Sequence, residues 1–499
     1  MTFRLVSYKQ LAAAMSLGLA LRLFFIVHFP FHAGDTRFYD ELARNWLDRG
    51  VYGLFINGQL LPVDLRVPGY PAFLAGVYAL FGRTGGAVMV VQALVDLVTC
   101  VLTALIAARL APASERTVVA TAALWMGALC PFTANYSAVL LTEVLATFLT
   151  TLALLVFVCA LGNASIDPPV RELDRTILLS PIGWWFLGGL IVGLGTLVRP
   201  DTPLVLIAVG VVLSVRWRRR ANWPKLALAA SWMAVGLLLP LTPWAVRNAR
   251  TLGRVQFLAP RLAESYGDFI PYGFYSWTRT WMVRFGEAYL VPWKLGKEPI
   301  PIETLPNSAF DSDSERARVA ALLSRYNGDL QMTPVLDREF KSLARERTAR
   351  RPLRTYVFIP LARAWVVWFT PRVQLLRYSG KLWPPSEKWR SNPVDFSATL
   401  GFGLLGFIYA GLALVGTWRC RTHLLRTEKG LALLAVFLAV RTAFLTQLPT
   451  VEPRYLIVCF PAVLAIGALV WMKPLPQVSL APRSSLSNEE KLVPGAARF

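Results

Sequence analysis

The sequence predicts an all-α polytopic membrane protein, and three observations support this fold class. First, 55% of the 499 residues are hydrophobic and only 16% are charged, a charged share well below that of a typical soluble domain. Second, runs of roughly 18 or more apolar residues recur along the chain, and each can cross a hydrocarbon core of about 30 Å. Third, Lys and Arg gather in short segments between these runs, as they do in cytoplasmic loops.

The apolar runs predict about 10 spans, within a range of about 10–13. The first run follows Arg4 and Lys9, but it is too long for the apolar core of a signal peptide and shows no convincing cleavage site. We therefore expect it to be retained as a span. The candidate spans are 11–31, 86–108, 117–134, 138–160, 182–198, 201–216, 226–245, 397–418, 429–447 and 454–472.

Two basic clusters orient the chain. "RWRRR" at 216–220 and "RCRTHLLRTEK" at 419–429 are expected in the cytoplasm, because cytoplasmic loops carry an excess of Lys and Arg. Counting spans from these clusters places the N-terminus inside. The same count places residues 32–85 and 246–396 outside.

The segment 353–370, "LRTYVFIPLARAWVVWFT", conflicts with this count if it crosses the membrane. We expect an interfacial or re-entrant segment instead, with Arg354, Arg363 and its Trp residues at the level of the lipid headgroups. Whether it crosses stays open at this point.

Four parts follow from this topology. We expect an N-terminal membrane module at 1–245, whose first outer loop is 32–85, and then a large outer loop at 246–396 that holds the interfacial segment. C-terminal spans follow at 397–472. The tail 473–499 is rich in Pro and Ser and is expected to be disordered in the cytoplasm.

The large outer loop contains a predicted helix. In "TPVLDREFKSLARERTARRP", Thr333 is a suitable N-cap and Pro334 a suitable first helical residue. Val335, Phe340 and Leu343 are expected to line one face.

The net charge of +22 divides between the cytoplasmic loops and the large outer loop. Positive-inside loops and attraction to anionic lipid account for it, so we expect membrane lipids, and not nucleic acid, as partners. The five Cys residues form no CxxC pair, and the three His residues show no ligand spacing. The sequence therefore requires no cofactor and predicts no metal site; a divalent metal is allowed but unsupported.

The stretch "HAGDTRFYDELARNW" follows the first span. Phe38, Leu42 and Trp46 recur at helical spacing between polar residues, which predicts an amphipathic helix on the outer surface. Asp35 at its start has two readings. It is either an N-cap that accepts a backbone N–H two or three residues on, or a functional carboxylate.

Two further polar groups stand where spans meet the outer surface. In "RVPGYPAF", the Pro and Gly residues make a stiff turn that presents Arg66 and Tyr70, and the guanidinium suits either a phosphate or the membrane surface. In "LLTEVLATFL", Glu143 begins an apolar run. A carboxylate there is costly and indicates a partner, a cap or a function.

Later segments add charges at other outer span ends. "LVRPDTP" is explained by a turn with a local ion pair between Arg199 and Asp201. Arg247 in "LTPWAVRNARTLG" is either a flanking residue of an aromatic belt or functional. The segment "TVEPRYLIV" at the outer mouth of the last span contains Glu452, Arg454 and Tyr455. It is either an interfacial anchor or functional.

Two Arg residues lie within predicted spans. Arg22 lies deep in the first span, and Arg441 lies below the outer mouth of the last spans. Neither reaches water easily, so each is expected to have an anionic partner.

Taken in order, the motifs resemble those of a known family. They are "GDTRFYDELARNWLDRGVYG", "RVPGYPAFLAGVYALFG", "LLTEVLATFLTTLALL", "GGLIVGLGTLVRPDT", "PWAVRNARTLG" and "EPRYLIVCFPAVL". Over roughly 11–472 the chain resembles the polyprenyl-phosphate-sugar-dependent glycosyltransferases of the GT-C fold. Within them it is most similar to the bacterial branch related to protein O-mannosyltransferases and the lipid A aminoarabinose transferase.

The resemblance implies a fold, a location and residue roles. The fold is GT-C-like, in a bacterial cytoplasmic (inner) membrane, with the active site facing outward. Asp35 takes the place of the catalytic carboxylate. Arg66, with Tyr70 nearby, takes the place of a ligand of the carrier phosphate. Arg454 and Tyr455 match the basic and aromatic pair at the mouth of the last span.

The chain departs from the family pattern at one position. Many relatives carry a second acidic residue where this chain has Thr36, which weakens the expectation of a protein acceptor. Arg441 is a further candidate for the phosphate. The remaining candidates for the substrate site are Tyr39, Tyr70, Glu143, Arg247 and Glu452.

The implied reaction fits these residues. A sugar on a polyprenyl phosphate carries an anionic leaving group, which needs positive charge and no general acid, whereas the acceptor hydroxyl needs a base. We therefore expect an inverting hexosyl- or pentosyltransferase with a lipid, glycan or protein acceptor. The alternatives are a polyprenyl-linked glycan polymerase or ligase and a lipid or sugar transporter, toward which only Arg22 and Arg441 point.

Overall fold

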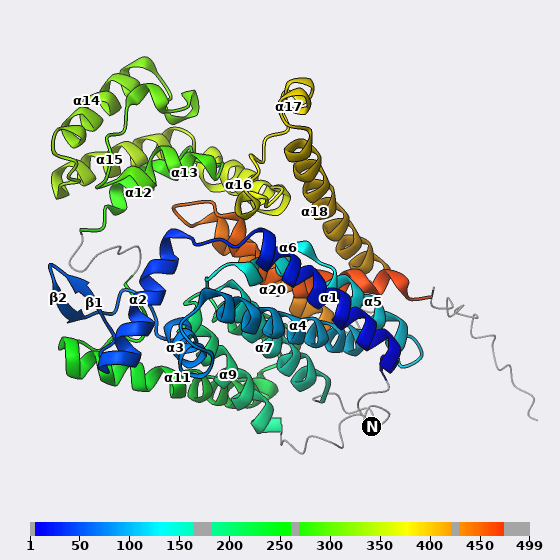
Figure 1. Ribbon diagram of the computed structural model, residues 1–499. Helices are drawn as coiled ribbons and strands as arrows, with labels where there is room; N and C mark the ends of the chain where they lie inside the picture. Colours follow the sequence, from blue (N-terminus) through cyan, green and yellow to red (C-terminus); the bar gives the residue numbers. More distant parts are fainter. Residues whose placement is uncertain (1–4, 164–180, 261–268, 421–428, 474–499) are drawn as a thin grey trace, which may run out of the picture.

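A computed structural model shows a body of long helices beneath a separate helical module (Figure 1). The described residues are 5–163, 181–260, 269–420 and 429–473. The helical fold class is confirmed, since 75% of the structure is helical and strands in the described part form one two-stranded hairpin. The predicted tail from 474 on, and nearly all of the basic cluster at 419–429, lie outside the described residues.

Among the described residues, six helical segments are long and apolar enough to cross a membrane. They are α1 (Tyr8–His28), α4 (Gly85–Leu110), α7 (Glu143–Asn163), α11 (Trp223–Leu252), α18 (Pro393–Arg419), and the run of η10 (Pro453–Cys459), α21 (Phe460–Gly467) and η11 (Ala468–Trp471). The protein is therefore a multi-pass membrane protein.

Other apolar helices bear on the number of spans. One bent pair counts as a further span if its parts, which meet at 44°, cross together. This pair is α5 (Arg116–Ala128) followed by α6 (Pro131–Ala134) and η2 (Asn135–Ala138). Shorter apolar helices are α3 (Gly69–Phe81), α9 (Pro181–Val198), α10 (Leu204–Arg216) and α20 (Lys429–Thr446). The total of about 10 spans requires some of these to cross, and it stays a prediction.

Helices α9 and α11 pack together through small residues. A Cβ atom added to Gly189 would meet the backbone of Met233, and one added to Gly236 would meet the backbone of Phe186. Lipid tails are as apolar as the helix surfaces, so close backbone packing takes over part of the role that the hydrophobic effect has in water.

The loop at 32–85, called the first outer loop after its predicted side of the membrane, contains the predicted amphipathic helix and one unpredicted hairpin. The helix is α2 (Gly34–Arg49), and the antiparallel hairpin is β1 (Gly53–Ile56) with β2 (Gln59–Pro62). Its turn is Asn57-Gly58, and both residues have positive φ, 51° and 79°. An Asn-Gly pair is a strong sequence signal for such a turn. The expectation of helices alone therefore overlooked a signal that the sequence carries.

The helical module between α11 and α18, called the outer module after its predicted side of the membrane, has its own hydrophobic core. It consists mainly of α12 (Tyr272–Thr278), α13 (Gly286–Leu290), α14 (Asp313–Asp329) and α15 (Pro334–Arg350), packed around the buried Trp277. The predicted cap of α15 is confirmed, because the Thr333 hydroxyl accepts the Leu336 N–H at 3.3 Å. Phe340 and Leu343 are buried as expected. Val335 was wrongly assigned to this face, since it is 47% exposed and Leu336 is buried in its place.

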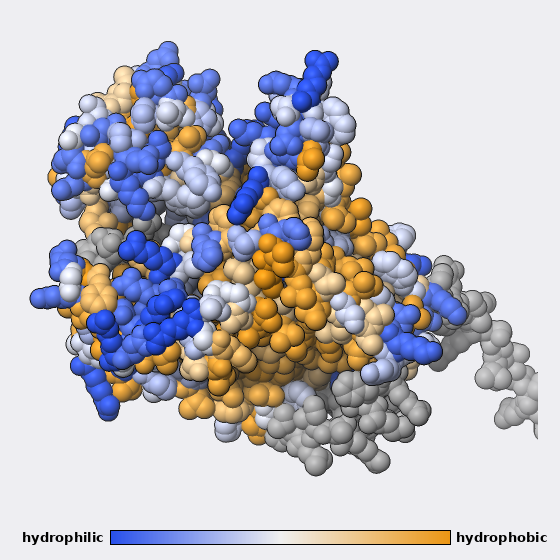
Figure 2. Space-filling model, viewed as in Figure 1, coloured by the Kyte–Doolittle hydropathy of each residue, from blue (hydrophilic) through white to orange (hydrophobic). Residues whose placement is uncertain are grey.

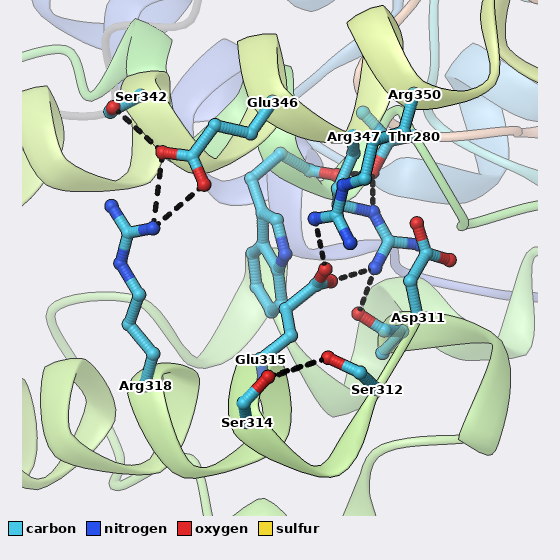
Figure 3. A network of polar contacts seen from close by, with 12 residues as sticks. Thr280, Asp311, Ser312, Ser314, Glu315, Arg318, Ser342, Glu346, Arg347 and Arg350 are labelled. Carbon is cyan, nitrogen blue, oxygen red and sulfur yellow. Dashed lines mark hydrogen bonds and ion pairs between the residues drawn. The ribbon is translucent and has the colours of Figure 1, made fainter.

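A network of ion pairs joins helices of the outer module (Figure 3). The fully buried Arg347 pairs with Glu315 and also donates to the Thr280 hydroxyl at 2.9 Å. Arg350 donates to the other oxygen of Glu315 at 2.6 Å. Such a network stabilises a fold when every buried charge keeps its partners. It ties α15 to α14 and to the end of α12.

The segment at 353–370 forms a short helical piece between the outer module and the membrane helices (Figure 1). It contains the π-helical turn η8 (Arg354–Phe358) and α16 (Ile359–Phe369), and it is not among the segments long enough to cross. Arg354 pairs with Asp311 of the outer module, and Arg363 is buried. Figure 2, in the same view, shows hydrophobic residues over much of the body, whereas hydrophilic residues dominate the outer module.

Candidate functional site

A cavity of about 890 Å³ lies between the first outer loop, the mouth of the last span and the outer module. It joins segments from both ends of the chain. Its charged and aromatic lining residues are Phe31, His32, Asp35, Phe38, Tyr39, Arg66, Tyr136, Tyr275, Phe285, Tyr289, Trp293, Lys297, Glu452, Arg454 and Tyr455.

The start of α2 sets the direction of Asp35. Ala33 is the N-cap, and its N–H donates to the Thr36 hydroxyl at 3.1 Å. That hydroxyl in turn donates to the Leu140 carbonyl at 3.0 Å, which fastens α2 to the segment before α7. The reading of Asp35 as the N-cap is therefore wrong. Because Thr36 takes part in the capping interaction, the Asp35 carboxylate is left to face the cavity.

Thr36 also explains the departure from two consecutive acidic residues. Its side chain is buried and donates to a backbone carbonyl. An ionised carboxylate has no proton to donate and would repel that carbonyl oxygen. The single acidic residue at this point follows from the way this chain anchors α2.

Asp35 lies between two guanidinium groups. Arg66 Nη2 lies 3.1 Å from Oδ1, and Arg454 Nη2 lies 3.5 Å from Oδ2. All three side chains keep between a fifth and a third of their surface exposed. Burial alone would raise the pKa of the Asp35 carboxyl, but the charges of Arg454 and Arg66 outweigh it and hold the pKa below its usual value.

Arg66 is positioned by a closely packed turn. Its backbone carbonyl accepts the Tyr52 hydroxyl at 2.8 Å, and its guanidinium lies over the Phe38 ring at 5.6 Å. Three residues on, a Cβ added to Gly69 would lie 2.5 Å from the Leu197 carbonyl oxygen. Only glycine allows this approach, which sets the turn against the outer end of α9.

Arg454 is positioned at the start of η10. Its Nε pairs with the buried Glu452, and the Tyr455 hydroxyl donates to the other Glu452 oxygen at 3.1 Å. The guanidinium also lies 5.2 Å from the centre of the Tyr455 ring. Glu452 and Tyr455 thus fix the direction in which Arg454 reaches Asp35.

A second layer of charges lies behind the cavity. Glu143 Oε1 accepts Arg199 Nη1 at 3.2 Å and lies 3.9 Å from Arg454 Nε. Arg199 Nε lies 3.5 Å from Asp201, which accepts Arg441 Nη2 at 3.1 Å.

The two layers form one network in which acids and bases alternate. Four carboxylates and four guanidinium groups take part, so their formal charges cancel. Buried charges persist only when they are paired in this way. One oxygen of this network, Glu143 Oε2, is buried and has no hydrogen-bond partner within the described residues. The predicted local pair of Arg199 and Asp201 is present, but it belongs to this larger network.

The structure separates the remaining predicted residues into two groups. Tyr39 lines the cavity, where burial first and then the charge of Asp35 raise the pKa of its hydroxyl to about 12. Tyr70 does not line it: it is fully buried against the Tyr39 ring and donates to Gln92 at 2.8 Å. Arg441 also lies behind the cavity, where it additionally donates to the Tyr455 carbonyl at 3.0 Å.

Arg247 and Arg22 have structural partners instead. Arg247 donates to the carbonyls of Tyr52 and Val63, at 2.6 and 2.9 Å, and so braces the hairpin against α11. Arg22 has the anionic partner that the sequence predicted, Asp96 of α4, at 2.6 Å.

The outer module contributes residues that the sequence did not single out. Tyr289, Trp293 and Lys297 line the cavity from α13 and the turn that follows it. The sequence signal for them is weak, since aromatic and basic residues are frequent throughout 246–396. Only the folded module brings them over the membrane helices.

Within the described residues, no three His, Cys, Asp or Glu side chains are grouped so that they could hold a metal ion. The groups that converge on the cavity are suited to a different ligand. Two guanidinium groups beside a carboxylate can bind an anionic group with bidentate hydrogen bonds and accept a proton next to it.

Comparisons with known proteins give structural matches alone. No family model and no curated protein matches the chain. The oligosaccharyltransferase AglB of Archaeoglobus fulgidus, in complex with an inhibitory peptide and a dolichol-phosphate, matches at 13% identity and a TM-score of 0.46, over 92% of this chain and 49% of that chain. ArnT from Cupriavidus metallidurans matches at 15% identity over 92% of this chain and 77% of its own, with a TM-score of 0.40 in the apo state and 0.37 bound to undecaprenyl phosphate.

The chain thus spans about half the length of the archaeal protein. A TM-score below 0.5 does not by itself establish an activity, which depends on the residues that this chain brings together.

Proposed function

We propose that the protein is an inverting glycosyltransferase that moves a sugar from a polyprenyl phosphate to an acceptor hydroxyl. One observation carries this proposal: a single carboxylate, Asp35, lies between Arg66 and Arg454 in a large cavity above the membrane helices. The outer face of a bacterial cytoplasmic membrane is the location proposed for this cavity. AglB and ArnT were solved with polyprenyl-type phosphates, and the proposed donor is of that class, but its support is the cavity itself.

The reaction needs one base and positive charge. The acceptor oxygen attacks the anomeric carbon, and the bond from that carbon to the phosphate oxygen breaks. The phosphate leaves with the electron pair, and the acceptor proton moves to Asp35. Attack from the face opposite the phosphate inverts the anomeric centre. Arg66 and Arg454 stabilise the charge that grows on the leaving phosphate.

Binding of the donor would also change Asp35. Without a ligand, the two Arg residues lower the pKa of this carboxyl, which makes it a weak base. A phosphate held by the same guanidinium groups would neutralise part of their charge and raise that pKa. The donor would thereby increase the basicity of the group that must accept the proton.

Glu452 and the second layer together keep Arg454 charged and in place. Glu452 and Glu143 supply its counter-charges, and Arg199 and Arg441 balance Glu143 and Asp201 in turn. Arg441 therefore acts in this proposal as a support of the site and not as a direct ligand of the phosphate. This differs from the sequence-based expectation, in which Arg441 was a candidate ligand of the phosphate.

The aromatic wall suits a sugar or another hydroxylated acceptor. Tyr289 and Trp293 both line the cavity and contact each other in an edge-to-face arrangement, with 4.3 Å between ring centres. Aromatic faces bind the apolar C–H faces of sugars while leaving their hydroxyl groups oriented. Whether the acceptor is a lipid, a glycan or a protein, and whether the sugar is a hexose or a pentose, are questions for an assay.

The two residues that pointed toward a transporter have other roles in the structure. Arg22 pairs with Asp96, and Arg441 pairs with Asp201. Both charges are therefore balanced by fixed partners within the protein. A polymerase or ligase that uses lipid-linked glycans remains an alternative, and it differs from the proposal in its substrate.

The test is a donor panel. Purified protein is incubated with polyprenyl phosphates that carry different sugars, with acceptor mixtures, and the release of free polyprenyl phosphate is measured. Turnover with a monosaccharide donor supports the proposal, and turnover with lipid-linked glycans alone supports the polymerase or ligase. Wild-type turnover in Asp35→Asn would end the assignment of the base. Asp48→Asn is the matched control, because Asp48 lies on the same helix but pairs with Arg83 outside the cavity.

A further inference from the structure

A second cavity, of about 540 Å³, lies between α12, α15, α16 and the end of α20. Its charged lining residues are Arg279, Lys341, Arg345 and Arg363, and no acidic side chain of the described residues lines it. Its lining residues are all different from those of the candidate site. The basic lining indicates a site for an anion, and the separate lining residues show that this site is distinct from the candidate site.

Arg363 is buried among neutral backbone groups. It is 1% exposed, and it donates to the carbonyls of Met282, Thr446 and Leu448 at 2.8–3.0 Å. Within the described residues, its Nη2 and the hydroxyl of Thr355, which lines the same cavity, are buried without a hydrogen-bond partner. A buried cation whose hydrogen bonds all go to neutral carbonyls is costly, and an anion in the cavity would offset that cost.

Lys341 and Arg345 extend this positive charge to the surface. They lie one turn apart on α15, and both are exposed. In the described part of the chain they form no ion pair, whereas Arg318 and Arg325 of α14 pair with Glu346 and Glu339 of α15. The module thus neutralises the Arg residues on its other face and leaves these two facing the cavity.

An apolar groove continues from the basic cavity. It has a volume of about 520 Å³, lies between α16 and α20, and shares Pro360, Thr446 and Gln447 with the basic cavity. Its other lining residues are Leu361, Ala364, Trp368, Leu438, Ala439, Thr442 and Ala443. A soluble anion would use the basic part alone. A molecule with a charged head and a hydrocarbon tail matches both parts.

We propose that the two cavities together bind one anionic phospholipid of the surrounding bilayer. Its phosphate lies among Lys341, Arg345 and Arg363, and one acyl chain lies in the groove between α16 and α20. The position fits, since α16 lies at the boundary between the hydrophilic module and the hydrophobic body (Figures 1 and 2). Its exposed Leu361 and Trp365 would face lipid.

The bound lipid would hold the outer module to the membrane helices. Arg363 and Arg279 already contact the loop that ends α20, through the Thr446 and Leu448 carbonyls and the Gln447 side chain. A phosphate at Arg363 would therefore lie beside the loop that leads to the candidate site, without entering that site.

The experiment compares two lipids with the same acyl chains. Detergent-purified full-length protein is titrated with phosphatidylglycerol, which is anionic, and with phosphatidylcholine, which is zwitterionic, and bound lipid is counted by native mass spectrometry. We expect phosphatidylglycerol to bind about tenfold more tightly or better. The double variant Lys341→Gln with Arg345→Gln should lose roughly 25-fold in affinity, since each basic side chain near an anionic headgroup is worth about a factor of five.

One control variant tests whether the charge must lie at the cavity, and one further variant tests the groove. Arg316→Gln with Arg338→Gln removes the same charge from exposed positions of α14 and α15 outside the cavity, and should bind phosphatidylglycerol as the wild type does. Ala439→Phe, at an exposed position of α20, should obstruct the groove and weaken lipid binding.

Three outcomes would overturn the proposal. Equal binding of the two lipids would remove the role of the headgroup charge. Unchanged binding in the Lys341 and Arg345 double variant would place the lipid elsewhere. Binding of inorganic phosphate as tight as that of phosphatidylglycerol, with no effect of Ala439→Phe, would show a site for free phosphate instead of lipid. None of these results depends on glycosyltransferase activity.

Discussion

Arg454 Nη2 lies 3.5 Å from Asp35 Oδ2, although 419 positions separate the two residues in the chain. This contact closes the cavity between the first outer loop and the mouth of the last span. It also joins the proposed base to a proposed ligand of the donor phosphate, so that the protonation of one depends on the charge of the other.

Asp35→Asn should reduce sugar transfer by about 10²–10⁴-fold, because the acceptor hydroxyl loses its base while the amide keeps the shape of the side chain. Release of polyprenyl phosphate by purified protein measures the effect. Asp48→Asn should retain full activity. A loss of the same size in both variants would show that the effect is not specific to the cavity.

Arg66→Gln should shift the acid limb of the pH–activity profile to higher pH. The Asp35 pKa lies below its usual value, so the wild type keeps its base ionised until the pH falls below the ordinary carboxyl range. The corresponding stabilisation by the ion pairs is present above the usual carboxyl pKa and is lost as pH falls through the lowered one. Removing one positive charge raises the pKa, and the base is protonated earlier.

The profile of kcat/KM against pH is the measurement, because its shape is independent of the lower overall rate. Arg66→Lys keeps the charge and should keep the acid limb near that of the wild type. An unchanged limb in Arg66→Gln would contradict the coupling between Arg66 and Asp35.

Glu143→Gln should destabilise the protein by about 3–5 kcal/mol, the range expected when one partner of a buried ion pair is removed. Arg199 and Arg454 would both lose a counter-charge in a region where Glu143 is 2% exposed. Thermal unfolding in detergent measures the change. Glu339→Gln removes an exposed pair with Arg325 and should cost at most about 1 kcal/mol. Equal shifts for the two variants would refute a special role for the buried network.

Arg347→Met should open the outer module. Arg347 lies at the centre of the network in Figure 3, and its guanidinium donates to Glu315 and to the Thr280 hydroxyl. The substitution removes this buried donor from both groups. Limited proteolysis within the module should become faster, and transfer activity should fall, because Tyr289 and Trp293 form one wall of the cavity. Arg318→Met, which removes an exposed pair with Glu346, should change neither measurement. Resistance of Arg347→Met to protease would show that the hydrophobic core alone holds the module.

Local patterns predicted the elements well. The apolar runs lie on helices, and Thr333 caps α15. On the predicted apolar face of α2, Leu42 is buried and Phe38 is partly buried, whereas Trp46 is exposed. These features depend on residues within a few turns of one another, so their signals are contained in short stretches. The hairpin at Asn57-Gly58 had such a signal as well, and it was overlooked.

The site could be predicted only in part. The cost of a charge at the end of an apolar run identifies Asp35, Glu143 and Arg454 as residues that need partners. The same reasoning selected Tyr70 and Arg247, which the structure places in packing contacts. It gave little weight to Arg199, which the structure connects to Glu143.

The sequence by itself determined that this protein crosses the membrane several times and that certain charged residues need partners near one surface. The tertiary structure alone decided which residues those partners are. Partner choice depends on helix packing, and here the packing depends on close contacts such as Gly69 against the Leu197 carbonyl and Gly189 against the backbone at Met233. Those contacts join residues far apart in the chain, so no local pattern specifies that Arg454 meets Asp35 or that Arg363 is buried against backbone carbonyls.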